Sequence, residues 1–449
     1  MTECQSELAL DFYPVRPLQV QFSGLDLSSD AGLLLVRQAE EHLGICRGLA
    51  GCIAEWRDSS KLVHPLIDLV SQRIYQIVGG YEDANDSNQM RHDPIYKIAC
   101  DRLPVVGEQA LASQPTMTRL ENHVSRPENA QMRRFFVDHF IAQYETPPCE
   151  LWLDIDGWDA PTYGEQQLSL FHGYYGQSMY FPVLINEASR GYPLVLQLRA
   201  GNSHPGKGVA GLLRWLFWRL KRAWPDVKLY FRADAGFALP EILRVCERSQ
   251  VGYVIGFGSN AVVKRKIEAR LEQARIVTCL TGAKARLFDD AYYQAGSWEA
   301  PRRLVMKAEW LLKGPNPRFV ITNLDHPPRV LYDHLYVQRG ADSEHRIKEL
   351  KLGIQATRLS CQTFVANQFR LLLSQAAYVL MVTLRQAAHG TQFATAQVTR
   401  LRSALIKGAA RVQVSVRRVL VELPACSPFA ADIRTIAQRL RNLPTVQIA

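Results

Sequence analysis

The sequence predicts an α/β protein in which a mixed β-sheet is flanked by helices. Three features predict it: helical periodicity in the first 148 residues, strands alternating with helices over residues 150–257, and a strand-rich stretch over residues 276–336. The chain has 449 residues, of which 47% are hydrophobic and 21% are charged. This length suits two to four domains, and the composition excludes a disordered or collagen-like chain.

The N-terminal region is expected to be mostly helical up to Pro147-Pro148. Residues 61–78 place apolar side chains at helical spacing after a pair of serines, and a Gly-Gly pair would end this helix. A second helix is predicted over residues 113–126, capped by Thr116 or Thr118. A plain surface helix is the commoner interpretation of such a segment; the alternative is a helix whose first turn meets DNA.

The middle of the chain alternates strands and helices, which favours a mixed sheet covered by helices. Three neighbouring strands come first, and strand–helix–strand units follow them. The predicted strands are Glu150–Asp156, Tyr180–Asn186, Pro193–Leu198, Val227–Phe231 and Gly252–Phe257, and the predicted helices are Val209–Ala223 and Pro240–Arg248.

A charged helix is predicted over Lys264–Ala274, and a strand-rich insertion follows it. The clearest strands of the insertion are residues 302–312, 318–324 and 329–337, separated by turns rich in Gly and Pro. The whole segment 261–336 therefore reads as a β-rich insertion into the sheet-forming part of the chain.

Helices return over Ser343–Leu352 and Thr363–Ala388. The apolar run from Leu371 to Leu384 is too short for a transmembrane helix, so we expect a core helix there and no membrane partner. Near the C-terminus, residues 411–423 alternate Val with Arg, Gln and Ser, which predicts a strand with one basic side.

The charge of the chain is concentrated at its C-terminal end. The net charge is +10, and the last 98 residues hold twelve basic residues against two acidic ones, so the rest of the chain is neutral. Eleven of the twelve are Arg, which binds phosphate oxygens through two nitrogens. The surplus is explained either by a solvated basic face or by a nucleic-acid backbone as the partner.

Several classes of site are disfavoured by the motifs that the sequence lacks. Nine cysteines occur without a CxxC or a Cys/His ligand spacing, which favours free thiols in a reducing compartment and makes a zinc site improbable. The N-terminal residues carry acids where a signal peptide would be basic, so we expect a cytoplasmic protein. Neither a phosphate-binding GxxxxGK[ST] loop nor a GxSxG elbow is present.

Carboxylates stand at positions where a strand or helix would expose them. Asp154 and Asp156 share one face of an apolar strand, Asp159 lies just beyond it, Asp234 ends another strand, and Glu344 belongs to a charged helix. Taken singly, each is more commonly a turn, cap or solvated residue. Taken together, three converging carboxylates suit two Mg²⁺ ions, which activate a water or a 3′-hydroxyl for phosphodiester displacement.

The segment YVQRGADSEHRIKELK resembles the Tyr-x2-Arg…Glu-x6-Lys signature of DDE insertion-sequence transposases of the cut-and-paste group. Tyr336, Arg339, Glu344 and Lys351 occupy its four positions. LDIDGWDAPTYGEQ and FRADAGF are similar to the first and second aspartate regions of that family, and the resemblance runs from about residue 20 to residue 425.

Two departures from the family pattern affect the assignment of the site. Four residues separate Arg339 from Glu344 where three are usual, and we expect the extra residue in the loop before the helix. Trp158 stands where the family commonly has Thr. The alignment favours Asp156 over Asp154 as the first ligand.

The resemblance implies a ribonuclease-H-like sheet and a site for two Mg²⁺ ions, with Mn²⁺ able to substitute. Asp156, Asp234 and Glu344 would be the catalytic metal ligands. Tyr336, Arg339 and Lys351 would contact the phosphates beside the scissile bond. In relatives a Trp of the β insertion stacks on a flipped base, for which Trp298, with Arg302 and Arg303 nearby, and Trp310 are the candidates here; burial in the core is the alternative for each.

The same resemblance implies a DNA transposase that cuts and joins the ends of an insertion sequence, with a hairpin intermediate as one route. Residues 1–148 would bind the terminal inverted repeats, with Arg119 among the contacts, and residues 149–260 with 337–390 would form the catalytic core. Residues 391–449, including Arg417 and Arg418, would contact DNA or the second subunit of a homodimer. Target DNA is a further partner, and a nucleoid-associated location follows. The alternatives are an inactive DNA-binding descendant and a metal-dependent nuclease.

Overall fold

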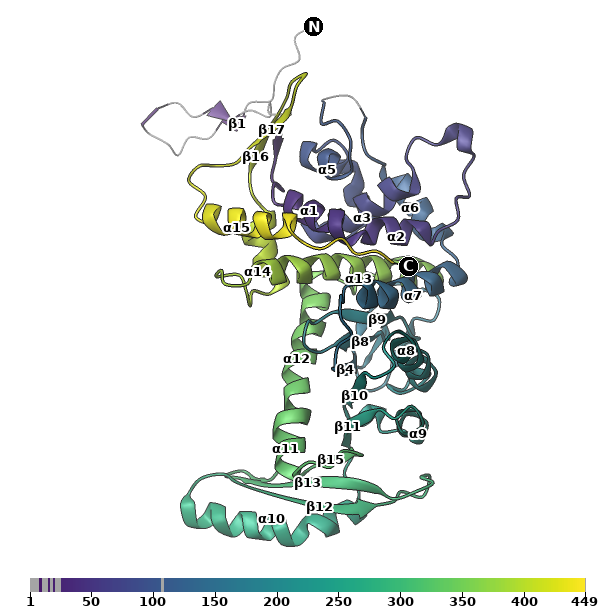
Figure 1. Cartoon of the computed structure of the whole chain (residues 1–449), viewed down its shortest axis with the longest axis vertical. Helices are drawn as coiled ribbons and strands as arrows, with labels where there is room; N and C mark the ends of the chain where they lie inside the picture. Colours follow the sequence, from purple (N-terminus) through teal and green to yellow (C-terminus); the bar gives the residue numbers. More distant parts are fainter. Residues whose placement is uncertain (1–7, 10–14, 17–18, 21–25, 106–108, 449) are drawn as a thin grey trace.

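The computed structural model describes residues 8–9, 15–16, 19–20, 26–105 and 109–448, so Cys4 and most of the N-terminal segment discussed above lie outside it. The described residues form a helical layer, a large β-sheet beneath it, and a long helix that runs beside the sheet (Figure 1). This arrangement confirms the predicted α/β class with a mixed sheet flanked by helices.

The large sheet has nine strands, in the order β12-β13-β15-β11-β10-β4-β8-β9 with β14 paired to β13. Strands β4, β10 and β11 are parallel, and the other neighbours are antiparallel. The bounds are β4 Glu150–Gly157, β8 Val183–Glu187, β9 Pro193–Gln197, β10 Lys228–Ala233, β11 Gly252–Phe257, β12 Ala285–Tyr293, β13 Arg302–Leu311, β14 Gly314–Pro315 and β15 Arg318–Thr322.

Helices cover both faces of this sheet. On one face lie α8 (Val209–Ala223) and α9 (Pro240–Arg248), with the bounds that the sequence predicts, and the ring of Phe217 in α8 packs against Phe231 in β10. On the opposite face lies α12 (Val337–Lys348; Figure 1). Strands covered on both faces need near-continuous apolar residues, and every residue of β8 is accordingly buried.

The segment 261–336 contains strands, as expected, and is helical where a further strand is predicted. Its strands β12, β13 and β15 join the central sheet through β15, which pairs with β11, so the segment extends that sheet. Residues 329–337, predicted as a strand, are helical: α11 (Pro328–Val330) leads through a π-helical turn, η4 (Leu331–Tyr336), into α12. A short apolar run fits either period, and here Pro at the first helical position starts a helix.

Helix α10 (Ala261–Thr281) is longer than predicted and covers β12 and β13. A second π-helical turn, η5 (Glu349–Gly353), continues α12, so the chain is helical from residue 328 to residue 353. The helix predicted over Ser343–Leu352 is therefore the C-terminal part of a longer one.

The helical layer is organised around α13 (Phe364–Ala387), which is buried along most of its length. Helix α13 contacts several helices of the N-terminal region and also strand β9. Helix α3 begins at Leu66, later than predicted, since Pro65 precedes it, and α6 is preceded by Ser113 in place of a threonine cap. Besides α13, the helices of the layer have these bounds: α1 Leu33–Leu43, α2 Ile45–Gly51, α3 Leu66–Gly79, α4 Ser87–Met90, α5 Pro94–Ala99, α6 Gln114–His123, α7 Arg126–Ala142, α14 Val398–Leu401 and α15 Ala430–Arg441.

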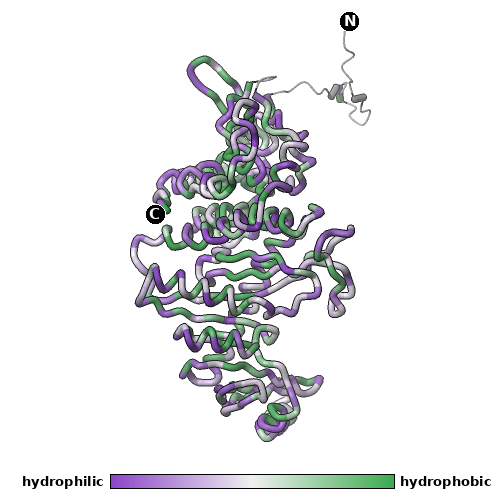
Figure 2. The backbone as a smooth tube through the Cα atoms, turned by 90° about the vertical axis from the view of Figure 1, so that its right-hand side faces the viewer, coloured by the Kyte–Doolittle hydropathy of each residue, from purple (hydrophilic) through white to green (hydrophobic). Residues whose placement is uncertain are grey.

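Hydrophobic segments concentrate in the strands and in this helical layer (Figure 2). In the described part of the chain, no helix is long and apolar enough to cross a membrane.

Residues 411–423, predicted as one strand, form a hairpin of β16 (Ala410–Val414) and β17 (Val419–Glu422). Ser415 N–H donates to the carbonyl of Arg418 at 2.9 Å and closes the turn. The hairpin, which we call the C-terminal arm, extends beyond the helical layer (Figure 1) and pairs at its base with β3 (Leu27–Ser28).

Part of the C-terminal charge is used in ion pairs within the protein. These side chains bind acidic groups, most of them in the N-terminal region: Arg370 pairs with Asp83 and Glu121, Arg385 with Glu349, Lys407 with Asp30, and Arg411 with Asp26. The exposed basic residues of this region are Arg358, Arg400, Arg411, Arg417, Arg418, Arg434, Arg439 and Arg441. Part of the C-terminal surplus therefore fastens the C-terminal region to the N-terminal helices, and the rest stays on the surface.

Candidate active site

Two of the predicted carboxylates meet at the ends of adjacent strands. Strands β4 and β10 are parallel, with Asp154 opposite Arg232. Two residues further along each strand, this register places Asp156 beside Asp234, and neighbouring strands are about 4.8 Å apart. The carboxyl ends of parallel strands are a common place for ligands in α/β sheets. The geometry thus assembles a pair of carboxylates from segments 78 positions apart.

Asp154 is committed to a structural ion pair. Its two carboxylate oxygens accept hydrogen bonds from Nε and Nη2 of Arg232 at 2.7 and 2.9 Å, and its side chain is fully buried. Arg232 also donates to the carbonyl of Leu335 in η4. With both oxygens engaged, Asp154 holds the sheet to the long helix and is not available as a ligand.

Asp156 is held by weaker contacts. One oxygen accepts from the N–H of Gly157 at 2.8 Å, and the other lies 3.5 Å from Nη1 of Arg339. Burial raises the pKa of Asp156 to about 6, with the charges of Asp234 and Glu344 adding to the shift and Arg339 opposing it. The shift in the pKa of Asp156 thus comes mainly from burial, and Asp234 and Glu344 add like charge that a bound cation would offset.

Asp234 caps the short turn after β10, where one of its oxygens accepts from the N–H of Gly236 at 2.9 Å. Glu344 is exposed on α12, near enough for its charge to act on Asp156. Among the described residues, no three His, Cys, Asp or Glu side chains are gathered closely enough to hold a metal ion. The structure brings Asp156 and Asp234 together and leaves Glu344 at their margin.

The extra residue between Arg339 and Glu344 does not lie in a loop, contrary to the expectation. Both residues belong to α12, and the chain is already helical from residue 328.

The three basic and aromatic residues of the signature also lie near the two carboxylates. Arg339 is buried and donates to the carbonyl of Ile155 at 3.1 Å. Lys351 Nζ donates to Asp159 Oδ1 at 2.7 Å. The hydroxyl of Tyr336 lies 2.4 Å from the position that a Cβ on Gly256 would occupy, so β11 needs glycine there.

In segment 261–336, three of the residues expected to stack on a base or bind DNA make contacts within the protein instead. The Trp298 ring is only 6% exposed and packs against Phe257 and Tyr293, so it is a core residue and the base-stacking expectation fails for this conformation. Arg302 makes two hydrogen bonds to Glu247, and Arg303 pairs with Asp290. Trp310, the other candidate, is half-buried in β13.

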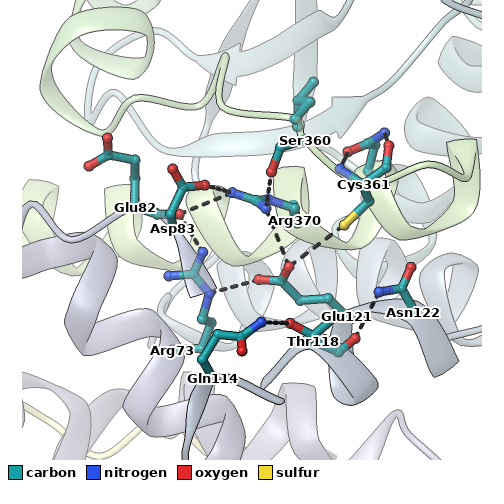
Figure 3. A network of polar contacts seen from close by, with 12 residues as sticks. Arg73, Glu82, Asp83, Gln114, Thr118, Glu121, Asn122, Ser360, Cys361 and Arg370 are labelled. Carbon is teal, nitrogen blue, oxygen red and sulfur yellow. Dashed lines mark hydrogen bonds and ion pairs between the residues drawn. The ribbon is translucent and has the colours of Figure 1, made fainter. Parts of the chain in front are cut away.

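Other predicted DNA contacts lie far from the carboxylates. Arg119 is exposed on α6, and Arg417 and Arg418 are exposed at the tip of the C-terminal arm. A buried polar network anchors α6, the helix that carries Arg119 (Figure 3). In it, Glu121 of α6 lies between Arg73 of α3, at 2.8 Å, and Arg370 of α13, at 3.3 Å.

Glu121 is ionised within this network. Burial alone would raise the pKa of Glu121, but Arg370 and Arg73 lower it below its ordinary value. Arg370 also bonds Ser360 and Asp83, so one guanidinium joins α13 to two parts of the N-terminal region (Figure 3). The exposed face of α6 therefore rests on a fixed support.

Sequence reasoning missed Arg232 and the partnership of Asp159 with Lys351. A charged residue inside the apolar strand VKLYFRA is the signal for Arg232, because a buried charge needs a partner. The Asp159–Lys351 contact joins residues 192 positions apart and leaves no local signal in the sequence.

Comparison with known proteins shows the family of this chain. A family model described as "Transposase DDE domain group 1" matches residues 12–445. No curated protein matches the sequence. Among solved structures, the cryo-EM structure of a piggyBac transposase synaptic complex with hairpin DNA is similar with a TM-score of 0.42 and 12% identity, over 84% of this chain and 80% of that one. Because the family model spans nearly the whole sequence, this chain belongs to the transposase family with a DDE domain of group 1.

Proposed function

We propose that this protein is an active DNA transposase that cuts the ends of an insertion sequence and joins them to target DNA. The observation that carries the proposal is the pairing of Asp156 with Asp234 at the ends of adjacent parallel strands, while neighbouring Asp154 is withdrawn into an ion pair. Glu344 on α12, whose charge already acts on Asp156, is the third carboxylate of the proposed site.

The strand arrangement supports a ribonuclease-H-like core. In the order β9-β8-β4-β10-β11, strands β9, β8 and β4 are antiparallel to their neighbours among these three. Strands β10 and β11 are parallel to β4. Helices lie on both faces, and the paired carboxylates stand on the central strand and its parallel neighbour. We assign β4, β8, β9, β10 and β11 to this core and β12, β13 and β15 to an extension of it.

Asp156, Asp234 and Glu344 supply the oxygen donors that Mg²⁺ prefers, and Mn²⁺ would accept the same ligands. When bound, such ions activate a water or 3′-hydroxyl and stabilise the leaving oxygen of the phosphodiester. Arg339 keeps Asp156 in place from beneath, and its contact with the Ile155 carbonyl fixes the end of β4. Tyr336, wedged over Gly256, sets how close α12 lies to β11.

We propose that DNA contacts basic residues both beside the carboxylates and further away. Lys351 is bound to Asp159 here, and a DNA phosphate would compete for its ammonium group. Arg119 on α6 and the arginines of the C-terminal arm would hold the duplex further away. Because an element has two ends, we propose a homodimer in which each subunit holds one end and the arm reaches DNA or the partner.

The test is incubation of the protein with DNA carrying the element's own ends and with target DNA, with and without Mg²⁺. We expect Mg²⁺-dependent nicking and 3′-end joining by the wild type and by Asp325→Ala, a fully exposed control, and neither by Asp234→Ala. Cutting without joining would make the protein a nuclease. Binding without cutting would make it an inactive descendant, and nicking by Asp234→Ala at the wild-type rate would refute the proposed site.

A further inference from the structure

The segment between β4 and β8 presents aromatic rings to solvent. Tyr163 is 93%, Tyr174 is 87% and Phe171 is 62% exposed. All three belong to a small sheet of β5 (Ala160–Pro161), β7 (Gln177–Tyr180) and β6 (Leu170–His172), or to its loops. Large aromatic side chains are usually buried for most of their area, and several exposed together indicate a contact surface.

A tight turn holds the exposed tyrosines in place. The N–H of Gly176 donates to the carbonyl of His172 at 2.8 Å, and Gly176 has a φ of 66°, which glycine adopts without strain. Within the turn, the rings of Tyr174 and Tyr175 lie edge to face with centroids 5.1 Å apart. Tyr175 packs in turn on the His172 ring at 5.0 Å. Tyr174 is therefore exposed but supported from behind.

This turn lies beside the paired carboxylates. The rings of Tyr175 and His172 both pack on Phe181, whose edge lies 3.2 Å from the Cβ position of Gly157, the residue after Asp156. Gln177, at the start of β7, donates to Asp159 at 3.5 Å.

The electrostatics agree with this placement. Burial raises the pKa of Tyr175, and the charges of Asp159, Asp156 and Asp234 add to the shift. The aromatic turn thus borders the same space as the carboxylates of the proposed reaction.

The chemistry of the turn favours an unpaired nucleobase as its ligand. Every base has a π-face that stacks on an aromatic ring, so such contacts tolerate any sequence. Bases inside a duplex have both faces covered by their neighbours, whereas a base at an opened or cut end offers one. A rigid ring beside the reacting phosphate would hold such a base and keep the strand end in position.

We propose that Tyr174, supported by Tyr175, stacks on an unpaired base of the DNA strand that lies at the Asp156–Asp234 site. The inference rests on the proposed function and adds to it a binding site for the opened strand. It gives the role that the sequence suggested for Trp298 to a different part of the chain, since Trp298 is buried.

The test measures binding of a duplex with two unpaired nucleotides at one end, one of them 2-aminopurine, against a blunt duplex, both in EDTA so that no cutting occurs. We expect Tyr174→Ala to bind the first probe about 5- to 150-fold more weakly and to quench 2-aminopurine less, while the blunt duplex is bound within about twofold of wild type. Tyr174→Phe, which keeps the ring, should behave as wild type. So should Tyr292→Ala, whose tyrosine is 71% exposed on edge strand β12.

Three results would overturn the proposal. The first is that Tyr174→Ala binds each probe as tightly as wild type does. The second is that Tyr174→Phe loses as much affinity for the unpaired probe as Tyr174→Ala. The third is that Tyr174→Ala changes the subunit number in light scattering, which would make a second copy of the chain the occupant. A wild type that stacks the probe but never cuts DNA would refute the proposed function alone. If the wild type cuts DNA, and Tyr174→Ala binds the unpaired probe and quenches 2-aminopurine as the wild type does, this inference alone is refuted.

Discussion

The two aspartates of β4 should respond in opposite ways to the same substitution. Asp154→Asn removes a carboxylate that makes two hydrogen bonds to Arg232, with Asp154 fully buried and Arg232 nearly so. An uncompensated buried guanidinium costs about 3–5 kcal/mol. The remaining bond from Arg232 to the Leu335 carbonyl places the expected loss near the lower end, about 3 kcal/mol. Asp154→Asn should still nick DNA in the presence of Mg²⁺, when the rate is expressed per folded molecule.

Asp156→Asn should leave stability within about 1 kcal/mol of wild type, because burial and two neighbouring carboxylates already disfavour its charge and Arg339 lies at the longer distance of 3.5 Å. It should abolish Mg²⁺-dependent nicking. Urea denaturation followed by tryptophan fluorescence gives the first quantity, and a plasmid-nicking assay gives the second. If Asp156→Asn is the less stable variant, or Asp154→Asn alone abolishes nicking, the assignment of the two roles is wrong.

Three further predictions concern the support and the reach of the molecule. Glu121→Gln should cost about 3 kcal/mol in urea denaturation, the lower end for breaking a buried ion pair, because it removes the buried carboxylate shared by Arg73 and Arg370 while Arg370 keeps Asp83 and Ser360. Glu41→Gln, in an exposed helix pair with Arg37, should cost under about 0.5 kcal/mol, and equal costs would contradict the network. Replacing both Arg417 and Arg418 with Ala should reduce the slope of log K against log salt for duplex DNA by about 1.8, and an unchanged slope would remove the C-terminal arm from the DNA path. His139 is buried in α7, where its ring nitrogens contact the Tyr192 hydroxyl at 2.8 Å and the Leu43 carbonyl at 3.0 Å. Burial lowers the pKa of His139 to about 4, so its contribution to stability is fully present above pH 6.5 and about 3 kcal/mol is lost as pH falls from 6.5 to 4. His139→Gln should flatten that part of the stability curve, and an unchanged curve would contradict a buried neutral imidazole.

The class of fold was predictable because strong apolar periodicity decides where helices and strands form. The helices Val209–Ala223 and Pro240–Arg248 and the strand Gly252–Phe257 have the bounds that the sequence predicts. Residues 329–337 were mistaken for a strand since their apolar run fits both periods, and only packing on the sheet selects the helix. The hairpin in residues 411–423 was missed because its turn, SVRR, carries no Gly, Asn or Pro.

At the site, the sequence predicts which strand ends carry carboxylates but not which of them are free. Asp154 and Asp156 share one face of β4 and are equivalent in their alternation along the strand. The family resemblance favours Asp156, and the position of Arg232 on the next strand gives the physical reason why Asp154 is engaged. Likewise, Trp298 has Arg302 and Arg303 nearby in the sequence, as a DNA-stacking residue would, yet tertiary contacts with Phe257 bury it. The charge surplus of the C-terminal region was assigned to DNA, because the sequence does not show that Arg370 faces acids of the N-terminal region.

The central claim is that Asp156 and Asp234 form a cation site, and binding of Mn²⁺ tests it most directly. Electron paramagnetic resonance of free Mn²⁺, titrated with protein in the presence of DNA, measures the ions bound. The account predicts binding by wild type and by Asp325→Asn, and loss of at least one ion in Asp156→Asn and in Asp234→Asn, with each variant folded as judged by circular dichroism. Equal Mn²⁺ binding by all four proteins would contradict it.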